Sequence, residues 1–148
     1  MFIYDTIIIG AGPAGLACAI ELSQFGVSCL VREARAGLNG VICGDDLSDS
    51  SIKAVIRLGI NIDHLNGKKI KYKKEYRDDK VIKTSFFDLF GVDYEIGIPR
   101  DYLDQFLLEH ALKCGVQVLF NTPFLNKVKQ NGYYLINNDY LGKSVVFA

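Results

Sequence analysis

The chain has 148 residues, the length of one compact domain, and its 17 Lys and Arg residues balance its 17 Asp and Glu residues. A formal net charge of zero argues against binding to nucleic acid or to a membrane through bulk positive charge. Apolar residues make up 49% of the chain and charged residues 23%, which is typical of a globular domain rather than a disordered segment.

The most apolar stretch, residues 6–20, is too short and too interrupted by glycine to span a bilayer. No basic segment precedes it, as one would in a signal peptide. The four cysteines form no CxxC pair, and no histidine or acidic cluster has the spacing of metal ligands. We therefore expect a cytoplasmic protein with no transmembrane segment, no disulfide framework and no metal site.

The first 33 residues predict one βαβ unit. A β-branched run over 3–9 ends at a glycine and indicates a buried parallel strand. Residues 13–25 carry apolar side chains at helical spacing, and Gly26 favours a helix stop. Residues 27–32 indicate a second strand, which a right-handed crossover would bring beside the first.

The middle of the chain predicts a glycine-rich loop, a helix and a hairpin. Residues 34–46 form the loop, and residues 48–58 the helix, with Ser48 or Asp49 as its cap. Residues 68–76 and 81–87 predict an antiparallel hairpin that pairs with nothing later in the chain. Its lysines, Lys69, Lys71 and Lys73, are interpreted as the solvated face of an edge strand, with an RNA site as the alternative.

The last third predicts a short strand over 94–98, a long helix over 101–114 and a strand over 116–120. A meander follows, with strands over 125–130, 133–136 and 143–147. Asn131-Gly132 between the first two of these strands is a strong hairpin signal.

The segment IIIGAGPAG over residues 7–15 is the part of the sequence that indicates a bound ligand. In this fingerprint Gly10 allows a tight turn, Gly12 lets the backbone approach a pyrophosphate, and Gly15 lets the helix pack close to the strand. The helix that follows directs free N–H groups and a positive dipole end toward the phosphates. A strand before it and a helix after it complete the context that the motif requires; a glycine turn without a ligand is the alternative.

The second strand ends at an acid, Glu33, which lies 18 residues after Gly15. A carboxylate at this point accepts hydrogen bonds from an adenosine ribose and repels a 2′-phosphate. NADP is therefore disfavoured at this site, while FAD and NAD both remain open. The flanking Arg32 and Arg35 are interpreted as solvated surface charges rather than phosphate contacts.

Three segments give the chain a family resemblance. GAGPAG over 10–15 resembles the FAD-dependent oxidoreductases of the glutathione-reductase-like fold, which include aromatic-ring hydroxylases and geranylgeranyl reductases. VICGDDLS over 41–48 resembles the Pro-x-Cys-Gly segment of the geranylgeranyl reductases, with Val41 in place of the proline. RDYLD over 100–104 resembles the start of the helix that contacts FAD in the same group.

The fingerprint and the resemblance together imply contacts with FAD. The residues expected to contact FAD are Gly10, Gly12, Pro13, Ala14, Gly15, Glu33, Cys43, Gly44, Asp46, Arg100 and Phe124. The resemblance also places Cys43 near the flavin ring, as the one tentative catalytic residue; the alternative is a small buried apolar residue. We expect FAD as the cofactor, with NAD less favoured and NAD(P)H as a transient reductant.

The resemblance implies an α/β fold: a Rossmann-like FAD/NAD(P)-binding domain whose parallel sheet is joined by an antiparallel meander crossover. Residues 1–148 would form a truncated FAD-binding domain, with 64–98 as the start of an interrupted substrate-domain sheet. The implied function is that of a flavin-dependent oxidoreductase acting on an apolar, isoprenoid or lipid-like substrate. An FAD-dependent monooxygenase and an inactive dinucleotide-binding fragment are the alternatives. The chain alone is expected to be inactive and to need a complementing C-terminal part, with no nucleic-acid partner.

Overall fold

The computed structural model describes residues 2–38, 43, 45–85 and 94–148. It divides into two compact units, the first formed by residues 1–41 and 104–148 and the second by residues 42–103. The helix α3, Arg100–Lys113, begins in the second unit and continues into the first.

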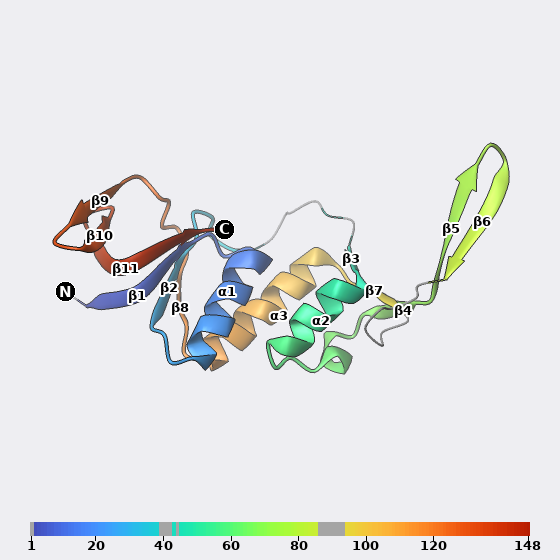
Figure 1. Cartoon of the computed structure of the whole chain (residues 1–148), viewed down its shortest axis with the longest axis horizontal. Coiled ribbons are helices and arrows are strands. Elements are labelled where there is room, and N and C mark those ends of the chain that lie inside the picture. Colours follow the sequence, from blue (N-terminus) through green and yellow to red (C-terminus); the bar gives the residue numbers. More distant parts are fainter. Residues whose placement is uncertain (1, 39–42, 44, 86–93) are drawn as a thin grey trace. The chain divides into compact units, whose positions relative to one another are not determined.

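The first unit is built on a six-stranded sheet with the order β8-β2-β1-β11-β10-β9 (Figure 1). These strands are β1 (Ile3–Ile9), β2 (Cys29–Arg32), β8 (Gln117–Leu119), β9 (Lys127–Gln130), β10 (Tyr133–Ile136) and β11 (Tyr140–Phe147). β8, β2, β1 and β11 run parallel, whereas β10 and β9 continue the sheet antiparallel. The predicted parallel sheet with an antiparallel meander is therefore confirmed.

The apolar run of β1 places side chains on both faces of this sheet, and Ile7 and Ile8 are both fully buried. The helix α1, Pro13–Gln24, packs on one face through its buried residues Gly15, Leu16, Ala19 and Ile20. On the other face Ile7, Leu30 and Ile136 form a core cluster surrounded by half-buried aromatic side chains of the meander. The sheet is thus covered on both sides, as a parallel sheet requires.

The second unit contains a three-stranded sheet with the order β3-β7-β4, formed by β3 (Asp46–Leu47), β7 (Glu95–Gly97) and β4 (Lys68–Ile70). The helix α2, Asp49–Arg57, is capped by Ser48, whose side chain accepts from the Ser51 N–H, as the sequence predicts. A short 3-10 helix, Ile62–Leu65, was not among the predicted elements. Ile52, Leu65 and Ile96 form the buried centre of this unit.

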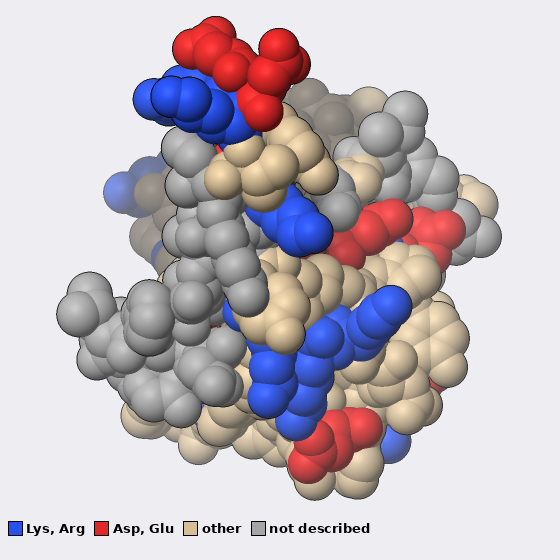
Figure 2. Space-filling model, turned by 90° about the vertical axis from the view of Figure 1, so that its right-hand side faces the viewer, with Lys and Arg blue, Asp and Glu red and all other residues tan. Residues whose placement is uncertain are grey.

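A separate two-stranded sheet in this unit consists of β5 (Tyr72–Arg77) and β6 (Lys80–Ser85), coloured green to yellow in Figure 1. Figure 2 shows the molecule from the right-hand side of Figure 1, with Lys and Arg in blue. The prediction of one strand over 68–76 is wrong, because the strand breaks at Lys71 and β4 pairs with the later strand β7. Gly67, just before β4, allows this pairing, since a side chain there would clash with Ile96 of β7. Only β5 and β6 form the isolated hairpin.

Candidate functional site

The turn between β1 and α1 requires glycine at position 10. Gly10 has a φ of +112°, a conformation that other residues rarely adopt, and its N–H donates to the Arg32 carbonyl at 2.8 Å. A Cβ at this position would also clash with the Ala148 carbonyl oxygen. Ala148 is held there because its N–H donates to the Ile9 carbonyl at 2.9 Å. Gly10 is therefore fixed by the fold itself.

Gly15 is also structural, whereas Gly12 is not. A Cβ on Gly15 would clash with the Gly10 carbonyl oxygen, so this glycine lets α1 approach the turn. Gly12 has an ordinary extended conformation, with φ −68° and ψ 176°, and a Cβ there would meet no atom within 4 Å. Nothing among the described residues demands glycine at position 12, and the open space beside it lies at the start of α1.

The start of α1 offers backbone donors to an anion. The helix begins with Pro13, which has no N–H, and no side chain caps it. The first internal hydrogen bond runs from the Leu16 N–H to the Gly12 carbonyl at 2.9 Å. The N–H groups before Leu16 therefore have no acceptor within the helix. Together with the helix dipole they make a site for phosphate oxygens beside the open space at Gly12.

The carboxylate of Glu33 lies next to this turn and is only 6% exposed. Its Oε2 accepts from the Ala11 N–H at 2.9 Å, and its Oε1 accepts from the N–H and the Nε of Arg35, both at 3.0 Å. Burial raises the pKa of Glu33, but the hydrogen bonds from Arg35 and Ala11 outweigh burial and lower the pKa. Glu33 is therefore ionised at neutral pH and keeps acceptor capacity at Oε2, where the second Arg35 contact is long, at 3.5 Å.

Of the two arginines beside Glu33, Arg32 is buried, so its interpretation as a solvated surface charge is wrong, whereas the Arg35 side chain is 40% exposed. Arg35 forms an ion pair with Glu33. Arg32 is 3% exposed, and its Nε and Nη1 have no hydrogen-bond partner among the described residues. Its guanidinium lies 5.1 Å from the centre of the Tyr140 ring. The reason is positional, because Arg32 pairs with Ile9 and Leu119 in the middle of the sheet, where both faces are covered.

The segment after β8 is tied to the backbone of Glu33. The Thr122 N–H donates to the Glu33 carbonyl at 2.8 Å, and the Asn121 N–H donates to the Arg35 carbonyl at 3.0 Å. Two residues further on, Phe124 is half-buried against the core cluster and makes an edge contact with the Phe147 ring at 5.0 Å. The structure thus brings the end of β2 and the segment 121–124 together, at the same end of the sheet as the glycine turn.

The predicted site residues of the second unit form a separate group. Cys43 is exposed, Gly44 lies outside the described residues, and Asp46 pairs with Gly97. Sequence reasoning missed Asp45, which has a φ of +56°. Its side chain accepts from the Arg100 N–H at 2.9 Å and its carbonyl accepts from the Ile98 N–H at 2.8 Å. The only sequence signal was an acid after a glycine in a predicted loop.

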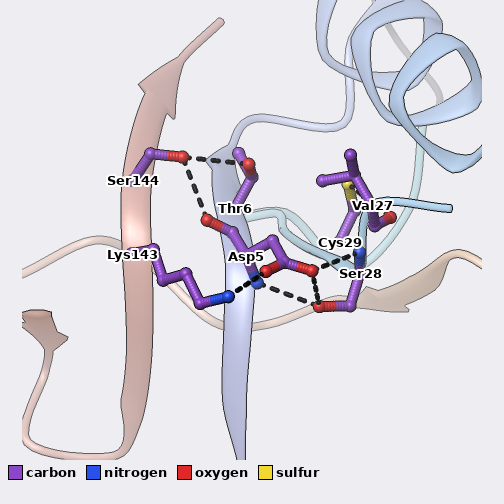
Figure 3. A network of polar contacts seen from close by, with 7 residues as sticks. All are labelled: Asp5, Thr6, Val27, Ser28, Cys29, Lys143 and Ser144. Atoms are coloured by element: carbon purple, nitrogen blue, oxygen red, sulfur yellow. Dashed lines mark hydrogen bonds and ion pairs between the residues drawn. The ribbon is translucent and has the colours of Figure 1, made fainter. Parts of the chain in front are cut away.

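A network of charged and hydroxyl side chains lies toward the other end of β1 (Figure 3). Asp5 accepts from Lys143 Nζ at 2.6 Å, from the Ser28 hydroxyl at 2.6 Å and from the Ser28 N–H at 2.9 Å. Hydrogen bonds from Lys143 and Ser28 hold the pKa of Asp5 well below its usual range. Because it joins β1, β11 and the start of β2, this network stabilises the sheet away from the glycine turn.

No helix in the described part of the chain is long and apolar enough to cross a membrane. No three His, Cys, Asp or Glu side chains among the same residues are grouped so that they could hold a metal ion.

Comparisons with known proteins match almost the whole chain. The family model described as an FAD binding domain matches residues 3–134. A digeranylgeranylglycerophospholipid reductase from Thermoplasma acidophilum is 29% identical over an alignment of 135 positions that covers 87% of this chain and 33% of that protein. A 2,4-dichlorophenol 6-monooxygenase from Delftia acidovorans is 22% identical over an alignment of 155 positions, gaps included. The alignment covers 93% of this chain and 26% of that protein.

Solved structures also match nearly the whole chain. A geranylgeranyl bacteriochlorophyll reductase-like protein from Thermoplasma acidophilum has a TM-score of 0.80 and 26% identity, over 99% of this chain and 39% of that one. A p-nitrophenol 4-monooxygenase from Pseudomonas putida shares the fold, with a TM-score of 0.84 and 16% identity over 100% of this chain and 41% of that one. The chain spans about a third of the length of the first of these curated relatives.

Proposed function

The chain belongs to the FAD-binding domain family, and from that premise we propose that it is the cofactor-binding part of a flavin-dependent reductase acting on an apolar, isoprenoid-type substrate. FAD is the cofactor, and the resemblance inferred from the sequence motifs is confirmed. The reductase activity and its substrate remain proposals, supported by the relative that reduces a geranylgeranylated phospholipid.

The observation that carries the proposal is the empty space at Gly12. The fold requires glycine at positions 10 and 15 but tolerates a side chain at 12, so the glycine there leaves room for a ligand. That room adjoins the free N–H groups of α1 and the ionised Glu33. These residues fit the pyrophosphate and ribose of FAD, because the donors suit phosphate and the acceptor suits a hydroxyl.

Each group of residues has a distinct role in this proposal. The backbone around Gly12, Pro13, Ala14 and Gly15 would bind the pyrophosphate, and Glu33 would accept from the ribose. Phe124 would lie near the adenosine end, which agrees with the bonds that tie its segment to Glu33. In the second unit, Cys43, Gly44, Asp46 and Arg100 would contact the flavin end. When bound, FAD supplies hydride transfer, while the protein binds and orients it.

Substrate, partners and location extend the proposal. In the complete reaction we propose a lipid-like substrate and NAD(P)H as the reductant. We also propose that residues 64–98 form the start of a substrate-binding sheet. These residues lie in a unit separate from the glycine turn, which supports this assignment. Turnover would need a complementing C-terminal part, since the reductase relative is about three times as long. The four cysteines form no disulfide in the described part of the chain, which supports a cytoplasmic location.

Two alternatives remain. The monooxygenase relative covers 93% of this chain and the reductase covers 87%, so the same cofactor site would serve oxygen insertion. In the other alternative the chain binds a dinucleotide and catalyses nothing. We favour reduction because the higher identity lies with the reductases.

The experiment is a calorimetric titration of the chain with FAD, NAD and NADP, followed by product analysis in the presence of a C-terminal part co-expressed from a longer relative. We expect the tightest binding for FAD and the weakest for NADP, because Glu33 repels a 2′-phosphate. Mass spectrometry then separates reduction, which adds two hydrogens, from hydroxylation, which adds one oxygen. Tighter binding of NADP than of FAD would contradict the site, and an oxygenated product would favour the monooxygenase.

A further inference from the structure

The zero net charge of the chain conceals a strong local asymmetry. Residues 68–85 contain eight Lys and Arg residues and three Asp and Glu residues, a local net charge of +5. The rest of the chain carries nine basic and fourteen acidic residues, a net charge of −5. Most of the basic segment is the β5–β6 hairpin, which pairs with no other strand among the described residues. The hairpin itself, residues 72–85, has five basic and three acidic residues, and Lys68, Lys69 and Lys71 precede it, so this part of the chain favours an anionic partner.

One face of the hairpin combines aromatic and basic side chains. Side chains alternate along a strand, so Tyr72, Lys74 and Tyr76 share one face, and the register places Val81 opposite Tyr76. Tyr72 is 57% exposed, Tyr76 72% and Val81 55%. No acidic residue occupies a position of this face, whereas the opposite face includes Glu75. We call the face defined by Tyr72, Lys74, Tyr76 and Val81 the tyrosine face.

The charges of the hairpin are not neutralised within the described part of the chain. Lys69, just before the hairpin, contacts Asp63 at 3.6 Å and the Tyr94 ring at 4.6 Å. Lys74, Arg77 and Lys80 have no such ion pair among the described residues, and the register sets Arg77 directly opposite Lys80. Like charges at opposite positions destabilise a hairpin, and an isolated two-stranded hairpin is only marginally stable in water.

The turn restricts how such a surface is approached. Asp78 and Asp79 form the tip, with φ values of 47° and 60°. Two carboxylates at the tip would be repelled by an anionic surface, so the hairpin would not approach it tip first. The hairpin would instead lie along the surface on one of its faces. The tyrosine face is suited to this, because tyrosine rings and lysine stems favour the boundary between lipid headgroups and acyl chains.

We propose that the β5–β6 hairpin docks on an anionic lipid membrane through its tyrosine face. Lys74 would contact lipid phosphates, while Tyr72, Tyr76 and Val81 would enter the boundary between headgroups and acyl chains. The choice of lipid over another polyanion rests on the proposed function, because a lipid-like substrate would be reached from the membrane surface. Lys74 is then part of a docking element on the hairpin.

The experiment measures co-sedimentation of the full 148-residue chain with lipid vesicles. Vesicles that contain phosphatidylglycerol are compared with vesicles of phosphatidylcholine alone, at low and at raised salt. Two variants are matched in chemistry and element: Lys74→Gln on the tyrosine face and Lys80→Gln on the opposite face. We expect Lys74→Gln to weaken binding about five-fold, the effect of one lysine near an anionic surface. Lys80→Gln should weaken it less, and Tyr76→Thr should weaken it while leaving the charge unchanged.

Other outcomes would overturn the proposal. They are equal binding to both kinds of vesicle, no binding to either, or equal losses for Lys74→Gln and Lys80→Gln. Tighter binding to a single-stranded RNA than to the anionic vesicles would assign the hairpin to nucleic acid instead. FAD titration of the same preparations separates this test from the proposed function, because the hairpin variants should retain wild-type FAD affinity.

Discussion

The guanidinium of Arg32 lies 5.1 Å from the centre of the Tyr140 ring and joins the end of β2 to the start of β11. β1 separates these two strands in the sheet, so the contact crosses the face covered by the meander. A cation–π contact contributes about 2 kcal/mol when it is desolvated. That is less than the cost of burying a cation whose Nε and Nη1 have no hydrogen-bond acceptor among the described residues.

Replacing Arg32 with Met should therefore stabilise the protein. Methionine fills a similar length of apolar space and removes the buried charge, and we expect the free energy of unfolding in urea to rise by about 1–3 kcal/mol. Tyr140→Leu provides the control, because its cost should be smaller in the Arg32→Met background than in the wild type. A loss of stability in Arg32→Met would mean that the guanidinium has a partner of its own.

Gly12→Val should abolish most FAD binding without unfolding the chain. The new side chain meets no protein atom at its Cβ but occupies the space assigned to the pyrophosphate, so we expect calorimetric FAD affinity to fall by an order of magnitude or more. Gly15→Ala is the matched control. Its methyl group would clash with the Gly10 carbonyl, which should lower unfolding stability by about 1–3 kcal/mol. An unfolded Gly12→Val variant would show that Gly12 serves the fold first.

Glu33→Gln should weaken FAD binding by about 1–2 kcal/mol, the scale of one hydrogen bond to a charged acceptor. The amide retains the size of the side chain but loses the charge that attracts the ribose hydroxyl and Arg35. Arg35→Gln separates these effects, because it removes the ion pair and leaves the carboxylate in place. If calorimetry gave the same FAD affinity for wild type and Glu33→Gln, the ribose role of Glu33 would be wrong.

The Asp5 network should make thermal stability depend on pH in the acid range. The pKa of Asp5 is lowered in the folded state, so its contribution is fully present above the unfolded value of about 3.9 and is lost as pH falls below it. Melting temperatures measured by circular dichroism from neutral to strongly acidic pH should fall less steeply for Asp5→Asn than for the wild type. Parallel curves for the two proteins would show that other carboxylates govern acid unfolding.

The parts of the fold with a local physical cause could be predicted from the sequence. The apolar run of β1, the turn at Gly10 and the Ser48 cap each act within a few residues, and the structure has each of them in place. The cofactor fingerprint belongs to the same class, because its glycines and Glu33 lie on one βαβ unit.

Features that depend on distant partners could not be predicted. The break at Lys71 arises because β4 pairs with β7, more than twenty residues later. The burial of Arg32 depends on the meander that covers the sheet, and its charge alone suggested exposure. Asp45 owes its role to the Arg100 N–H, 55 residues away. In each case the deciding contact is made by a segment that local pattern does not identify.

The parallel pairing of β11 with β1 has a practical consequence for protein engineering. It carries Ala148 to the edge of the glycine turn, where its N–H bonds to Ile9 and its carbonyl lies against Gly10. Ile3, which pairs with Leu141, lies at the opposite end of the same strand pair from Ile9 and Phe147. An affinity tag or fluorescent fusion at the C-terminus would emerge beside the glycine turn. A tag at the N-terminus would leave that turn open, so ligand measurements should use N-terminally tagged protein.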